Sequence, residues 1–155
     1  MNHSMEAPLF HFATSGETHI VSSLVERGTQ SAIAPQHTSP WNECTRQIMA
    51  LPFYEEQASP SQLTRVFACY LVQTTFLLSE KTDTSWEKPL INSTAKGEIV
   101  LEWWRSEHEL TVYVHEGRCH FLRVWGTNIF NEMDEGDFGT AFLSPLTYLW
   151  LWLHS

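Results

Sequence analysis

Three histidines fall close together in the second half of the chain, at positions 108, 115 and 120, with glutamates beside them. A metal centre needs three or four such side chains converging on one ion at about 2.0–2.2 Å. His115, His120 and Glu102 are the candidates for such a group, which would make the protein a small metal-dependent hydrolase. Their spacing matches no established zinc motif, and no cysteine pair accompanies them. Solvent-facing histidines are therefore the favoured interpretation, and no cofactor is expected.

Side chains for nucleophilic catalysis lack the local sequences that activate them. Cys44, Cys69 and Cys119 each lie within an apolar segment, which predicts buried cysteines. No serine occupies a Gly-x-Ser-x-Gly elbow, and the sequence contains no glycine-rich phosphate loop. The favoured class is thus a protein without catalysis. The scattered cysteines also indicate free thiols in a reducing compartment, which predicts a cytoplasmic location.

The net charge and the length of the chain further narrow the classes of protein to which it can belong. The chain has 155 residues and a formal net charge of −9, from nine Lys and Arg against eighteen Asp and Glu. Direct nucleic-acid binding is not expected, because it needs clustered Lys and Arg to contact phosphates. No apolar run approaches the roughly 20 residues of a membrane-spanning helix, and residues 1–12 lack the pattern of a signal peptide.

The elements that would position these side chains follow from periodicity. Residues 1–40 are rich in Ser, Thr and His and predict a loosely ordered N-terminal segment, whereas residues 41–155 predict a single domain. Helices are expected from Pro40 to just before Pro52 and over about 60–79, with Ser59 as the cap of the second. A third helix, apolar nearly all round, is expected over about 145–154 with Ser144 as its cap.

Alternating apolar residues predict strands over 98–104, 109–115 and 119–125, with Glu116–Gly117 as a tight hairpin turn. An extended pair at Leu90–Ile91 precedes them, and the acidic stretch 127–142 is interpreted as a solvated loop. The predicted fold class is α+β: a three- or four-stranded antiparallel meander packed on the main helix, with the C-terminal apolar helix beside it. Leu101, Trp103, Val112, Phe67, Tyr70 and Leu71 are expected to form one core cluster.

The centre of the chain also resembles a known group. The phrases are FACYLVQTTFLLSE, PLINSTAKGEIVLEWW, HELTVYVHEG and FLRVWG, which together span about 63–125. This stretch is similar to a widespread group of small bacterial proteins in which a helix leads into a GEIxLEWW strand and a β-meander. The resemblance implies the same α+β arrangement and a bacterial origin, and it implies no catalytic residues. The Trp-Asp-Gly-Tyr-type phrase that many members carry before the helix is replaced here by residues 52–56, PFYEE.

Large aromatic and apolar side chains exceed what a small core absorbs, so some should serve partner binding. The candidates are Trp104, Tyr113, Trp125, Leu151 and Trp152. The leading hypothesis is a non-catalytic bacterial interaction module, antitoxin-like or inhibitory, that binds another protein through an acidic and aromatic surface. The alternatives are the hydrolase centred on the hairpin histidines and a structural subunit of a larger bacterial assembly. The C-terminal helix also offers a surface for self-association.

Overall fold

The computed structural model describes residues 39–52, 58–128 and 130–155, which belong to one compact unit. The described part contains three helices and one five-stranded antiparallel sheet, which confirms the α+β class. The predicted loosely ordered segment 1–40 lies outside the described residues except for its last two. In chain order the elements are α1 (Pro40–Met49), α2 (Gln62–Thr82), β1 (Leu90–Ser93), β2 (Ile99–Arg105), β3 (His108–His115), β4 (Arg118–Val124), β5 (Met133–Phe138) and α3 (Leu143–Leu153).

The sheet is a simple meander with the strand order β1-β2-β3-β4-β5, and every neighbouring pair is antiparallel. The predicted hairpin is confirmed, because Val114 pairs with Cys119 across the turn. Glu116 and Gly117 take φ values of 47° and 75°. Two positive φ values in a two-residue loop match the twist of the flanking strands, which is why such turns are common in hairpins.

The sheet has two more strands than the three clear alternating segments indicate. β1 extends the predicted Leu90–Ile91 pair, and β5 replaces the predicted solvated loop, so that interpretation is wrong for Met133–Phe138. The strand forms because β4 offers a free edge and charged side chains of the two strands pair across it, as Arg123 does with Asp134. Gly136 gives the Phe121 ring its room, since a Cβ at this position would lie 2.8 Å from that ring and the ring would have to shift.

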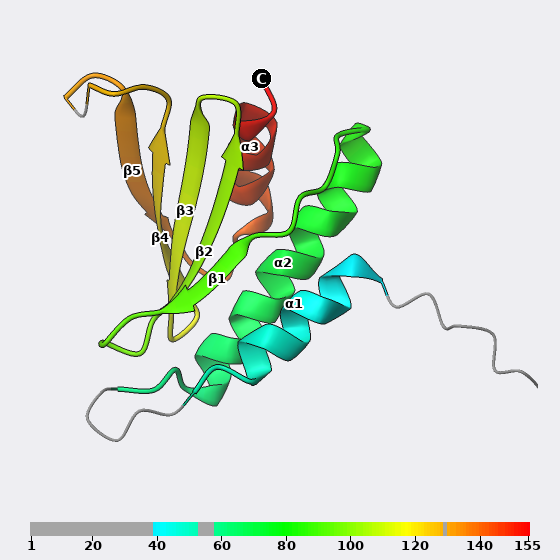
Figure 1. The fold of residues 1–155 in the computed structure, drawn as a ribbon, viewed down its shortest axis with the longest axis vertical. Coiled ribbons are helices and arrows are strands. Elements are labelled where there is room, and N and C mark those ends of the chain that lie inside the picture. Colours follow the sequence, from blue (N-terminus) through cyan, green and yellow to red (C-terminus); the bar gives the residue numbers. More distant parts are fainter. Residues whose placement is uncertain (1–38, 53–57, 129) are drawn as a thin grey trace, which may run out of the picture. The chain divides into compact units, whose positions relative to one another are not determined.

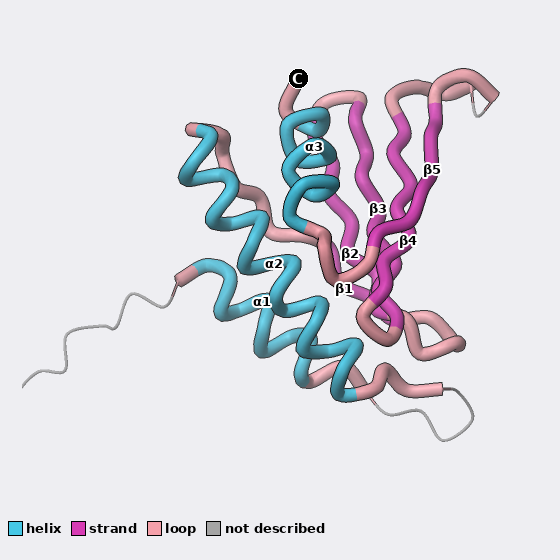
Figure 2. Tube along the Cα trace, turned by 180° about the vertical axis from the view of Figure 1, so that it is seen from behind, coloured by secondary structure: helices cyan, strands magenta, loops and turns pink. Residues whose placement is uncertain are grey.

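The register divides the sheet into two different faces. Successive residues of a strand point to opposite sides, so residues that pair across strands share a face. The inner face carries the core, with Ile91, Ile99, Leu101, Trp103, Leu110, Val112, Val114, Cys119 and Phe138 all buried. Figures 1 and 2 show α1, α2 and α3 on this side of the sheet only.

The main helix differs from its prediction in its ends and in one core residue. It begins at Gln62 and ends at Thr82, and its cap is Ser61, whose hydroxyl accepts a hydrogen bond of 3.1 Å from the Thr64 N–H. Phe67 and Leu71 join the core as predicted, whereas Tyr70 is 56% exposed. The apolar residues lie nearly all round this helix, so the sequence did not distinguish the face turned to the sheet from the face that borders α1.

A buried arginine joins α1 to α2. Arg65, on the first turn of α2, is 2% exposed and donates to the carbonyls of Ile48, Met49 and Leu51 at the end of α1, at 2.7, 3.2 and 3.1 Å. Its Nε also donates to the Pro60 carbonyl at 3.1 Å. The last carbonyls of a helix have no partner within the helix, so this guanidinium supplies the donors that α1 lacks.

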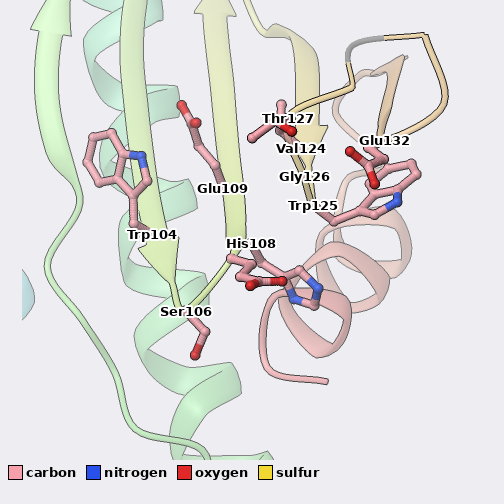
Figure 3. A pocket seen from close by; sticks show the side chains of 10 residues that line it. Trp104, Ser106, His108, Glu109, Val124, Trp125, Gly126, Thr127 and Glu132 are labelled. Atoms are coloured by element: carbon pink, nitrogen blue, oxygen red, sulfur yellow. The ribbon is translucent and has the colours of Figure 1, made fainter.

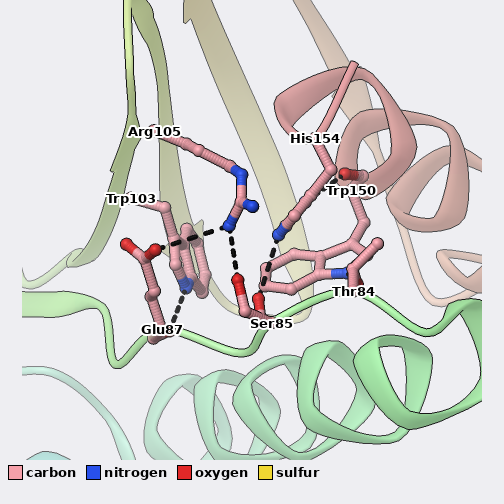
Figure 4. Close-up of polar contacts among 7 residues, drawn as sticks. All are labelled: Thr84, Ser85, Glu87, Trp103, Arg105, Trp150 and His154. Atoms are coloured by element: carbon pink, nitrogen blue, oxygen red, sulfur yellow. Dashed lines mark hydrogen bonds and ion pairs between the residues drawn. The ribbon is translucent and has the colours of Figure 1, made fainter.

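The C-terminal helix α3 packs on the inner face, as its apolar stripe predicts: Leu146, Leu149, Trp150 and Leu153 are all buried. It begins at Leu143 with Phe142 as cap, so the predicted Ser144 cap is wrong. Polar contacts fasten it to the connection between α2 and β1 (Figure 4). Trp150 Nε1 donates to Thr84 Oγ1 at 3.0 Å, and His154 Nε2 lies 3.0 Å from the Ser85 carbonyl oxygen.

Replacing Leu101 with Ala tests the predicted core. Leu101 is fully buried at the centre of β2, so the substitution should lower the free energy of unfolding by about 2–5 kcal/mol. Urea denaturation followed by circular dichroism measures the change. The control is Leu77→Ala on α2, where the side chain is 52% exposed and a change within about 0.5 kcal/mol is expected. Equal effects of the two substitutions would contradict this placement of the core.

Candidate functional site

The side of the sheet turned away from the helices has no described element over it (Figures 1 and 2). We call this side the outer face. Along its rows it carries Leu90, Asn92, Val100, Glu102, Trp104, Glu109, Thr111, Tyr113, His115, Arg118, His120, Leu122, Val124, Met133, Glu135 and Asp137. Trp104 is 47% exposed, and Tyr113 is half-buried. An open sheet face of this composition combines aromatic surface with carboxylates.

The carboxylates of the outer face outnumber its cations. Its four carboxylates face one arginine, Arg118, and two histidines, His115 and His120. The His120 ring lies 3.5 Å from Glu135 and 3.2 Å from Asp137. Glu102 and Glu109 occupy diagonal positions on neighbouring strands. The pKa of Glu102 lies above its usual value. Partial burial of the carboxylate is the larger cause, and the negative charge of Glu109 is the smaller one. The fold thus holds two carboxylates close together beside Trp104 at a cost to its own stability.

A hollow of about 460 Å³ opens at one end of the outer face, where β2 turns into β3 and β4 leaves the sheet. We call it the Trp104–Trp125 hollow, and its principal walls are Trp104, Glu107, His108, Glu109, Trp125 and Glu132. Figure 3 shows Trp104 at one side, Trp125 with Glu132 at the other, and Glu109 and His108 between them. The turn that carries Glu107 includes Ser106, whose φ is 54°.

An arginine beneath the sheet positions one wall of this hollow. The Arg123 guanidinium lies 5.7, 5.3 and 5.3 Å from the ring centroids of Trp125, Tyr148 and Trp152. It also bonds Asp134 through Nε at 3.0 Å and Nη2 at 2.7 Å. A cation over several aromatic faces and on a carboxylate is stabilised by both interactions. Arg123 therefore holds Trp125 and α3 in a fixed relation to β4.

The aromatic residues predicted to bind a partner separate into two groups. Trp104 and Tyr113 lie on the outer face, and Trp125 lines the hollow at its end. Leu151 and Trp152 belong to α3, on the other side of the sheet. Leu151 is 47% exposed, whereas Trp152 is half-buried and stacks on His108 with ring centroids 4.6 Å apart. Trp125 connects the two groups, because its ring lies 6.1 Å from that of Trp152 and also lines the hollow beside Trp104.

The predicted metal-binding residues share a side of the sheet but do not converge. His120 pairs with Tyr113 in the register, His115 pairs with Arg118 beyond it, and Glu102 pairs with Thr111. Across residues 39–52, 58–128 and 130–155, no three His, Cys, Asp or Glu side chains form a group that could hold a metal ion. The His120 ring is instead engaged with β5 carboxylates.

The prediction of buried cysteines is met by two of the three. Cys44 and Cys119 are buried and Cys69 is half-buried. Burial raises the pKa of all three thiols, and it raises that of Cys119 to about 12. A thiol with a raised pKa is a poor nucleophile, because the reactive form is the thiolate.

Sequence reasoning missed most of the hollow. Glu107, Glu109 and Glu132 come from a turn, a strand start and the segment after β4, and no local motif links them. One signal was available for the first two, because a tight turn after Trp104 places Glu109 opposite that residue in the next strand. No such signal exists for Glu132, whose Oε2 accepts a hydrogen bond of 2.7 Å from the Asn128 N–H.

Comparison of the chain with protein-family models, with curated proteins and with solved structures finds no match. In the described ranges, no helix has the length and apolar character needed to cross a bilayer. The fold and the site geometry are therefore the basis on which a function is inferred.

A Glu102→Gln variant tests the cost of placing a charged carboxylate at this half-buried position beside Glu109. The pKa of Glu102 is raised in the folded state, so folding disfavours its charged form, and this cost is absent at pH values below the usual pKa. The cost grows as the pH rises through the window between the usual and the folded pKa. Glu102→Gln should therefore increase the free energy of unfolding at neutral pH, and the increase should vanish in acid. Denaturation at both pH values measures it.

The matched control is Glu80→Gln, which removes the same charge from an exposed position on α2. It corrects for the general benefit of reducing a net charge of −9. A gain in stability at Glu102 no larger than that at Glu80 would show that the charged form of Glu102 carries no local cost in the folded state.

Alkylation tests the burial of Cys119. With its pKa near 12 and its side chain enclosed, Cys119 should stay unlabelled by iodoacetamide in the native protein at mildly alkaline pH. It should be labelled fully in denaturant, which peptide mass spectrometry detects. Cys69, which is half-buried, provides the internal comparison and should react faster. Rapid native labelling of Cys119 would contradict its place in the core.

Proposed function

We propose that this chain is a non-catalytic interaction module that binds another protein through its outer face. The observation that carries the proposal is that this face combines Trp104, Tyr113 and closely spaced carboxylates with no described element over it. Accessible Trp and Tyr side chains on an open sheet face are typical of protein-binding surfaces, since these residues contribute most to the binding energy. The positions of Glu102 and Glu109 favour the same interpretation, because a cation of a partner would offset the repulsion between these two carboxylates.

The partner should present a basic surface. The chain carries a net charge of −9, and the outer face adds carboxylates where contact would occur. Complementary charge accelerates encounter and selects against acidic partners. An enzyme that acts on nucleic acid has a basic surface of this kind, so an inhibitory or antitoxin-like role is the form of the proposal that fits best.

Quantitative affinity capture with matched variants tests the proposal. The 155-residue chain is immobilised, and bound proteins are compared by mass spectrometry between the wild type and a Trp104→Ser/Tyr113→Ser variant. A true partner should be recovered at least about tenfold less with the variant, the effect of losing one binding hot spot. Circular dichroism establishes that both proteins are folded.

The control is a Tyr70→Ser/Leu77→Ser variant, which removes two exposed apolar side chains from α2, on the side of the sheet opposite the outer face. Capture of the same partner should be unchanged with it. Loss of the partner with the α2 variant, and retention with the outer-face variant, would place the binding surface on the helices and refute the proposal.

A further inference from the structure

The Trp104–Trp125 hollow has the chemistry of a site for one side chain. Its walls include three carboxylates and two indoles, and no Lys or Arg lines it. Glu107 and Glu109 form no ion pair with any described residue, while Glu132 is held in place by the Asn128 N–H. An uncompensated group of carboxylates between aromatic rings attracts a cation with a flat apolar surface.

We propose that this hollow receives an arginine side chain of the partner, an inference that rests on the proposed function. A guanidinium is planar, always charged and weakly hydrated, so it stacks on an indole and donates sideways to carboxylates at the same time. Trp104 and Trp125 supply the rings, and Glu109 lies between them (Figure 3).

The chain already contains the same set of interactions in a second place. Arg123 lies over the rings of Trp125 and Trp152 and donates to Asp134. Trp125 therefore contacts a guanidinium on the inner side and lines the hollow as well. Because Arg123 and its aromatic neighbours fix this indole, an incoming side chain meets a wall that is already in position, which lowers the entropy cost of binding.

Two other cations fit the hollow less well. A divalent metal ion needs several oxygen ligands converging at one point, and no three carboxylates of the described chain do so. A lysine ammonium would match the charge of the carboxylates, but it is a compact, strongly hydrated group that gains less from contact with an indole face. Arginine is therefore the ligand that uses both the rings and the carboxylates.

Peptide titration followed by nuclear magnetic resonance tests the inference. The probe is an acetylated and amidated Gly-Gly-Arg-Gly-Gly peptide, and the neutral control replaces Arg with citrulline, which keeps the shape and removes the charge. The arginine peptide should shift the indole N–H signals of Trp104 and Trp125 and the amide signals of 106–109. The citrulline peptide should leave them unchanged, and a lysine peptide should bind about threefold or more weakly.

Paired variants separate the hollow from the general acidity of the chain. Glu109→Gln should weaken arginine-peptide binding by about fivefold, the effect of losing one charge-assisted hydrogen bond. Glu135→Gln removes the same charge from the outer face outside the hollow and should change binding by less than about twofold. Equal effects of the two variants, or equal shifts with the citrulline peptide, would overturn the inference.

A separate titration with millimolar calcium chloride identifies the rival ligand. Shifts of the same signals by calcium that match those of the arginine peptide would make the hollow a metal site and refute the arginine assignment. The outcome is distinguishable from failure of the proposed function. If the captured partner still depends on Trp104 and Tyr113 while the arginine peptide does not bind, the outer face binds its partner by other contacts.

Discussion

The unequal coverage of the sheet is the constraint on which the rest of the structure depends. All three described helices pack on the inner face, so the apolar residues of β1–β5 meet them there and form a single core. The outer face must then be compatible with solvent or with a partner, and it carries carboxylates among its aromatic residues. The register of the strands determines both the core and the outer face, since a shift of a strand by one residue would turn its core side chains outward and its outer side chains inward.

Much of this arrangement follows from local sequence. The alternation in 98–125 and the Glu116–Gly117 turn predict β2, β3, β4 and their pairing, because both signals act within a few residues. The same alternation assigns Trp104 and Tyr113 to one side of the sheet. The apolar stripe of α3 likewise predicts which four of its side chains are buried.

The remainder depends on partners that are distant in sequence. β5 has little apolar alternation, and it forms because it can pair with the edge of β4. Two contacts fit it there: Asp134 forms an ion pair with Arg123, and Gly136 leaves space for the ring of Phe121. Tyr70 was assigned to the core because α2 is apolar on several sides, and only the packing of α1 decides between them. The Trp104–Trp125 hollow combines a turn, a strand start and a later segment, so no short motif could predict it.

The arginine that closes the end of α1 has a consequence for the order in which this chain assembles. A ten-residue helix is marginal by itself in water, and the carbonyls at the end of α1 find their donors on Arg65, in the first turn of α2. The last turn of α1 is therefore stabilised only when the first turn of α2 has formed, and the two helices unfold and fold as one cooperative unit. A loosened α2 would release α1 with it, and it would also free the β3–β4 turn, whose Glu116 N–H donates to the Thr64 hydroxyl of α2 at 3.0 Å.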